Sequence, residues 1–134
     1  MVLIKQPTRT SCGPTCVAML TGAPVETVIG MLRKHRPGRH TDGARVQDLA
    51  LLLGHFGQAL GASTWVRSGF GDAHGLVEWH HRTPAGQYRR GWHCLVVSGG
   101  LIYDPESPAP VPATQWFAAR HNHKLILHPV SAAK

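Results

Sequence analysis

The spacing of the apolar residues changes partway along the chain, and this change constrains the fold more than any other feature. In the first half the apolar residues recur at helical spacing, as in the stripe of Val28, Ile29 and Leu32. Beyond Gly57 the spacing shortens to the alternation that is typical of strands. Helices followed by strands indicate an α+β fold, in which N-terminal helices pack on a C-terminal antiparallel β-sheet.

Capping and turn residues give the expected bounds of these elements. Helices are predicted over Thr15 to Thr21, closed by Gly22, over Pro24 to about Lys34, and over Ala44 to Phe56 with Thr41 or Asp42 as its N-cap. Strands are predicted over 63–67, 76–82, 92–97, 101–104 and 124–130, with a short helix near 113–121 and a surface connection over 105–112. Cys12 therefore lies at the N-terminal edge of the first helix.

Length and composition favour one folded domain over residues 1–134. Of the 134 residues, 43% are hydrophobic and 16% are charged, which is typical of a globular protein and not of a disordered chain. No apolar run reaches the roughly 18 residues of a membrane span, and Pro7 interrupts the start before a signal-peptide core could form. We therefore expect a cytoplasmic protein, whose three cysteines, an odd number, do not form a disulfide framework.

The charge balance favours acidic partners. Fourteen Lys and Arg against seven Asp and Glu give a net charge of +7. Much of this charge falls in two stretches, residues 33–40 and 82–90, whose Gly and Pro content predicts loops. Two interpretations stay open: solvated loops that keep the protein soluble, or a patch that binds nucleic acid or an anionic substrate.

The cysteines point to a nucleophile more than to a metal or redox site. Cys12 and Cys16 are separated by three residues, whereas a dithiol motif has two. The chain has no Cys-x2-Cys pair, and no His-x3-5-His arrangement completes a structural zinc ligand set, so we expect neither a metal nor another cofactor. A helix N-terminus favours the thiolate form of a cysteine, which makes Cys12 the candidate nucleophile and leaves Cys16 for core packing.

A candidate base and its partner lie in the second half. If Gly99 and Gly100 form a two-residue hairpin turn, His93 and Asp104 share one face of two paired strands as diagonal neighbours, within reach of each other's side chains. Taken singly, His93 could be a core histidine and Asp104 part of an ordinary turn before Pro105. Their joint placement favours a Cys12 and His93 thiol site.

Three short blocks together resemble a known family. They are Gln6 with Cys12-Gly13 and the helix Val17-Ala18-Met19-Leu20, then 43–49 with Leu52 and Gly57, then 91–97 with Tyr103-Asp104-Pro105. This set is similar to the double-glycine-leader peptidases, the bacteriocin-processing branch of the papain-like cysteine peptidases. The resemblance implies a papain-like fold that binds a peptide or protein substrate. It also implies a role for each matching residue: Cys12 nucleophile, His93 general base and acid, Asp104 orienter of His93, and Gln6 oxyanion hole.

The substrate is not carried over with the resemblance. The leader peptidases are usually fused to an ATP-driven exporter, and we expect this chain to be a stand-alone peptidase domain without a transporter. Deamidation and acyl transfer would use the same acyl-enzyme and stay open beside hydrolysis. The alternative from another class is a basic module that binds nucleic acid or a protein on a catalytically silent papain-like fold.

Overall fold

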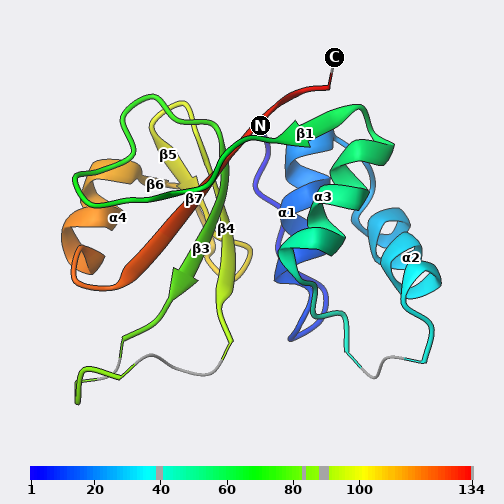
Figure 1. Ribbon diagram of the computed structural model, residues 1–134, viewed down its shortest axis with the longest axis horizontal. Helices are drawn as coiled ribbons and strands as arrows, with labels where there is room; N and C mark the ends of the chain where they lie inside the picture. The colour runs from blue at the N-terminus through cyan, green and yellow to red at the C-terminus, as the bar shows by residue number, and fades with distance from the viewer. Residues whose placement is uncertain (39–40, 83, 88–90, 134) are drawn as a thin grey trace.

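The fold is the expected α+β arrangement. A computed structural model describes residues 1–38, 41–82, 84–87 and 91–133. Within these ranges there are four helices and a seven-stranded antiparallel sheet. Three helices lie together on one side of the sheet and the fourth lies on the other side (Figure 1). No helix in the described ranges has the length and hydropathy that a membrane crossing requires.

The helices are α1 (Cys12–Thr21), α2 (Val25–His35), α3 (Val46–His55) and α4 (Ala113–Arg120). The first helix begins three residues earlier than predicted, because the Thr15 N–H already donates to the Ser11 carbonyl at 3.0 Å and Pro14 fits a first turn where its missing N–H is not needed. Its end is as predicted, with Gly22 left-handed at φ 77° and its N–H on the Ala18 carbonyl.

Two expectations about the loop before α3 are wrong. The N-cap is Arg45 and not Thr41 or Asp42, because the Asp42 carboxylate is engaged elsewhere, by Arg33 at 2.8 Å and by the Thr8 hydroxyl at 2.9 Å. The basic stretch 33–40 is also not wholly a loop, since its first three residues form the last turn of α2. Cationic side chains there stabilise the helix C-terminus.

The sheet has the strand order β1-β7-β3-β4-β5-β6, with β2 also paired to β7. Its strands are β1 (Gln58–Leu60), β2 (Thr64–Trp65), β3 (Gly75–His80), β4 (His93–Ser98), β5 (Leu101–Tyr103), β6 (Val111–Pro112) and β7 (Lys124–Ala132). Strands β1 and β6 were not predicted, since two or three residues are too few to show an alternation. The other strands lie where the sequence placed them, within three residues at each end.

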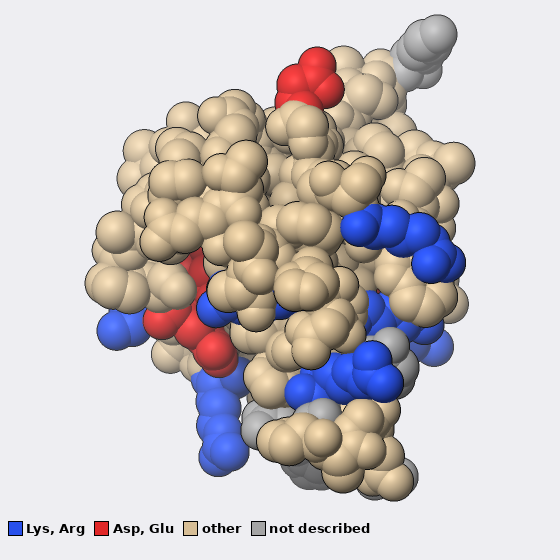
Figure 2. Space-filling model, turned by 90° about the vertical axis from the view of Figure 1, so that its left-hand side faces the viewer, with Lys and Arg blue, Asp and Glu red and all other residues tan. Residues whose placement is uncertain are grey.

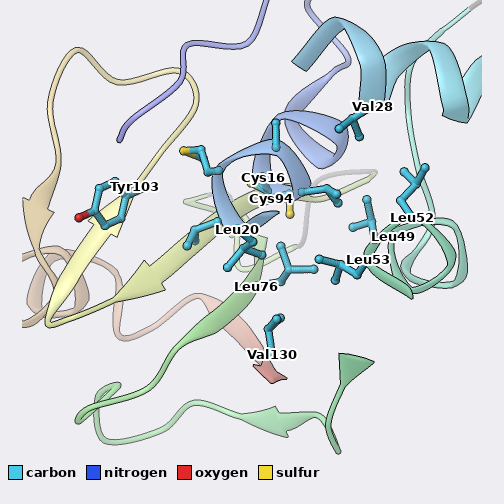
Figure 3. Close-up of a cluster of buried hydrophobic side chains, with 14 of the residues drawn as sticks. Cys16, Leu20, Val28, Leu49, Leu52, Leu53, Leu76, Cys94, Tyr103 and Val130 are labelled. Atoms are coloured by element: carbon cyan, nitrogen blue, oxygen red, sulfur yellow. The ribbon is translucent and has the colours of Figure 1, made fainter. Parts of the chain in front are cut away.

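The core has two layers, one on each face of the sheet. Between the sheet and α1 to α3, side chains such as Leu53 and Leu76 are buried together with Cys16 and Cys94 (Figure 3). Between the sheet and α4, Trp116 packs against the opposite face. Because successive strand residues point to opposite faces, each central strand contributes to both layers.

The β4–β5 hairpin has the predicted register. Gly99 and Gly100 have φ 57° and 77°, the left-handed conformation that a two-residue hairpin turn of this kind requires. Ser98 pairs with Leu101, and Val96 pairs with Tyr103. Asp104 therefore leaves β5 beside the start of β4, where His93 stands.

Candidate functional site

Cys12 is the first residue of α1, and its position is fixed from both sides. Before it, the buried Ser11 hydroxyl accepts from the Thr8 N–H at 3.1 Å and donates to the Thr8 carbonyl at 3.0 Å. After it, Gly13 lies so close to α3 that a Cβ there would stand 3.0 Å from a methyl of Leu49. The thiol itself stays partly exposed. Cys12 is thus held rigidly at a helix N-terminus, where unpaired N–H groups favour a negative charge.

His93 and Asp104 form a short hydrogen bond at the start of β4. The distance from His93 Nε2 to Asp104 Oδ1 is 2.7 Å, and the same carboxylate oxygen accepts the Glu106 N–H at 2.9 Å. Both side chains are largely buried, with 19% and 14% of their area exposed. Since Nε2 is taken by Asp104, the other ring nitrogen of His93 is left for Cys12.

The pKa values of this pair are displaced in opposite directions. Burial lowers the pKa of His93, but hydrogen bonds to Asp104 and to the Cys12 thiol outweigh it and raise the pKa from 6.5 to about 10. Burial raises the pKa of Asp104, but the His93 ring and the Glu106 N–H outweigh it and hold this pKa below its usual value. At neutral pH His93 is therefore a cation between two groups that can carry negative charge.

Cys12 and His93 line one cavity of about 380 Å³. The helical side contributes residues from α1 and from the loops before α1 and α3, and the sheet side contributes the start of β4. The lining residues are Arg9, Thr10, Cys12, Gly13, Gly43, Ala44, Arg45, Gly91, Trp92, His93 and Cys94. The fold thus brings the thiol of a helix residue and the carboxylate-bound imidazole of a strand residue to the same cavity.

Gln6 lies beside the turn that follows Asp104, but it does not line the cavity that Cys12 and His93 share. Its backbone N–H donates to the Pro105 carbonyl at 2.9 Å, next to Asp104. Its side-chain amide donates to the Thr8 and Arg9 carbonyls at 3.0 and 3.2 Å, while its Oε1 is buried without a partner among the described residues. The amide therefore holds the loop that leads into α1, and its oxyanion role stays a prediction.

Two further side chains, those of Trp79 and Glu106, lie beside His93. Trp79, which pairs with His93 across β3 and β4, meets its ring edge-to-face at a centroid distance of 6.2 Å. Glu106 Oε2 lies 4.0 Å from His93 Nε2. Ligand atoms of His93, Asp104 and Glu106 lie within 4.8 Å of one another, as a metal site would need. Because Nε2 and Oδ1 already bond each other, a cation there would break the His93–Asp104 hydrogen bond.

The other two cysteines belong to the core, as predicted for Cys16. Cys16 and Cys94 are 0% and 1% exposed and lie side by side between α1 and β4 (Figure 3). Burial raises the pKa of Cys16 well above its ordinary value, and the neighbouring Cys94 raises it further. Both are therefore expected to be unreactive, in contrast to Cys12.

The predicted basic stretches are described only in part, because residues 39–40, 83 and 88–90 lie outside the described ranges. On the face that carries α4, Lys and Arg side chains spread over the middle and lower parts, while acidic side chains show at the top and at the left (Figure 2). Arg67 stacks on Trp65 with its guanidinium carbon 4.5 Å from the ring centroid, and Arg120 stacks on Trp116 at 4.6 Å. Because the Arg67 and Arg120 guanidinium groups lie over aromatic rings, these two cations contribute to local packing.

Comparison with known proteins finds a match to the fold of the chain but none to a family model or a curated sequence. No protein-family model and no curated protein sequence matches the chain. A solved structure does match: a double-glycine-motif protease from an AMS/PCAT transporter, crystallised in complex with the leader peptide. The two chains share 17% sequence identity and superpose with a TM-score of 0.55 over 96% of this chain and 91% of that one. The chain has a papain-like peptidase fold. At this identity the likeness concerns the papain-like fold alone.

Proposed function

We propose that the chain is a papain-like cysteine peptidase that hydrolyses a peptide bond through an acyl-enzyme on Cys12. The observation that carries this proposal is the cavity that Cys12 and His93 line together, with Asp104 2.7 Å behind His93. A nucleophile, a base and an orienter in this order are what thiol acyl transfer requires. The match to a protease crystallised with a leader peptide supports a peptide as the substrate.

The proposed reaction starts from a Cys12 thiolate beside a protonated His93. The thiolate attacks the substrate carbonyl carbon, and the carbonyl electron pair moves onto the oxygen. Hydrogen bonds from the Cys12 backbone N–H, and from the Gln6 amide once it leaves the Thr8 and Arg9 carbonyls, would stabilise this oxyanion. The intermediate collapses as the C–N bond breaks, and His93 gives its proton to the leaving amine.

Water completes the reaction. Neutral His93 takes a proton from a water molecule, whose oxygen attacks the thioester carbonyl. The second tetrahedral intermediate then releases the carboxylic acid and the Cys12 thiolate, which restores the charge pair with His93. Asp104 keeps one proton on Nε2 throughout, because its carboxylate accepts the hydrogen bond from this nitrogen.

A peptide library tests the proposal on many candidate substrates at once. A proteome-derived peptide mixture is incubated with the wild-type chain and with Cys12→Ala, and new termini are counted by mass spectrometry. We expect cleavage at a defined set of sites by the wild-type chain, and a loss of at least about 10³-fold in kcat/KM in Cys12→Ala and in His93→Ala.

Cys16→Ala is the matched control, because it removes a thiol that is buried away from the cavity. Circular dichroism spectra of the variants establish that each is folded. Cleavage by Cys12→Ala at the wild-type rate, or no cleavage of any peptide by the folded wild-type chain, would contradict a peptidase.

A further inference from the structure

The helical side of the cavity carries two arginines and no acid. Arg9 comes from the loop before α1, and Arg45 is the N-cap of α3. These two loops lie side by side at one end of the helices (Figure 1), joined by the Asp42 N–H, which donates to the Thr10 hydroxyl at 2.9 Å. Among the described residues that line the cavity, none is Asp or Glu.

Arg9 and Arg45 lack the close ion pairs that nearby arginines make. Arg33 and Arg36 each stand 2.8 Å from a buried carboxylate, that of Asp42 and that of Asp48. Arg45, whose side chain is 63% exposed, has only a 3.7 Å approach from its Nε to Asp48.

The Asp48 carboxylate has little remaining capacity to accept a hydrogen bond from the Arg45 side chain, because its Oδ2 already accepts from Arg36 and from the Arg45 backbone N–H. The side chain of Arg9 is exposed and makes no ion pair within the described ranges. The outer guanidinium N–H groups of both arginines are therefore available to a ligand in the cavity.

We propose that Arg9 and Arg45 bind a carboxylate of the substrate next to the scissile bond. A guanidinium presents paired N–H donors that match the two oxygens of a carboxylate. The protonated His93 on the opposite wall adds positive charge to the same space. This inference rests on the proposed peptidase function and names its substrate class: peptides with an Asp or Glu side chain, or a free C-terminal carboxylate, close to the cleaved bond.

Two alkylating reagents test the carboxylate site without any peptide. Iodoacetate and iodoacetamide differ only in a carboxylate against an amide, and both alkylate Cys12. The ratio of their rate constants cancels effects that are common to both reagents. Relative to the ratio for a free thiol, we expect the wild-type ratio to favour iodoacetate, and we expect the double variant Arg9→Gln/Arg45→Gln to reduce it about tenfold at low salt.

Arg67→Gln is the matched control, since it removes the same charge from a residue that stacks on Trp65 and does not line the cavity. We expect it to leave the ratio unchanged. An equal ratio in the wild-type chain and the Arg9→Gln/Arg45→Gln variant would overturn the carboxylate site. An equal fall in the Arg67→Gln variant would also overturn it, because net charge alone would then explain the effect.

Peptide pairs identify the source of the carboxylate. One pair exchanges Glu for Gln within a few residues of the scissile bond, and the other exchanges a C-terminal acid for an amide. A kcat/KM preference for the acid that is lost in Arg9→Gln/Arg45→Gln assigns the source, and a preference that persists in this variant counts against the site. If no peptide is cleaved, the peptidase proposal fails, while the iodoacetate ratio still decides whether the arginines bind a carboxylate.

Discussion

Replacing Asp104 by Asn is expected to lower the pKa of His93. The rise from 6.5 to about 10 corresponds to roughly 5 kcal/mol, which Asp104 and Cys12 supply together against the effect of burial. One charge-assisted hydrogen bond contributes about 1.5 to 3 kcal/mol, so its loss should bring the pKa down by about 1 to 2 units. The amide oxygen that the substitution introduces can still accept the Glu106 N–H, and the turn should therefore survive.

The assay is an NMR titration of the His93 ring in the wild-type chain and in Asp104→Asn. Glu106→Gln is the control, because its carboxylate is 4.0 Å from Nε2 and 59% exposed, so that solvent screens it. We expect the His93 pKa to move by less than about half a unit in this variant. An unchanged His93 pKa in Asp104→Asn, or an equal change in both variants, would refute the assigned roles.

The same pKa predicts how stability depends on pH. His93 binds its proton more tightly in the folded chain than in the unfolded one. Its contribution is therefore fully present below about pH 6.5, the unfolded value, and is lost as the pH rises through about 10. Urea unfolding between pH 6.5 and 10 should show this loss in the wild-type chain. The loss should be smaller in Asp104→Asn, and an equal loss in both chains would contradict the linkage.

Three further predictions concern the fold and are read from thermal or urea unfolding. Gly75→Ala should destabilise by about 1 to 3 kcal/mol, because its Cβ would stand 2.2 Å from the His128 carbonyl oxygen, whereas Gly30→Ala in α2 meets nothing and should be neutral or stabilising. Leu53→Ala should cost about 2 to 5 kcal/mol, since Leu53 is fully buried; a cost below about 1 kcal/mol would contradict its packing. Hydrogen bonding to Arg33 lowers the pKa of Asp42, so the wild-type chain should lose stability below about pH 4, and Asp42→Asn should flatten that loss.

The features predicted well from the sequence are those that local chemistry determines. Gly99-Gly100 fixes a two-residue turn, and this turn alone sets which residues of β4 and β5 face each other. The left-handed Gly22 ends α1 in the same local way. The position of Asp104 relative to His93 therefore followed from a few adjacent residues.

The features that were missed depend on contacts between distant segments. Trp79 stands opposite His93 because β3 pairs with β4, and the segment that joins these strands, residues 81–92, is too long for a two-residue turn motif to predict that register. Arg9 and Arg45 both line the cavity because Asp42 joins their loops through hydrogen bonds with Thr8 and Thr10. Nothing in the sequence around an exposed arginine before a helix indicates that its side chain lines a cavity.

The central claim is that Cys12 is an activated thiol, and alkylation of the native chain by iodoacetamide tests it most directly. The chain supplies its own controls, since Cys16 and Cys94 are buried and Cys12 is not. Mass spectrometry of each cysteine peptide after short pulses across pH 5 to 9 gives three rate constants in one sample. We predict rapid labelling of Cys12 alone that persists below pH 7 and is lost there in His93→Ala. Equal, slow labelling of all three cysteines in the folded chain would contradict the account.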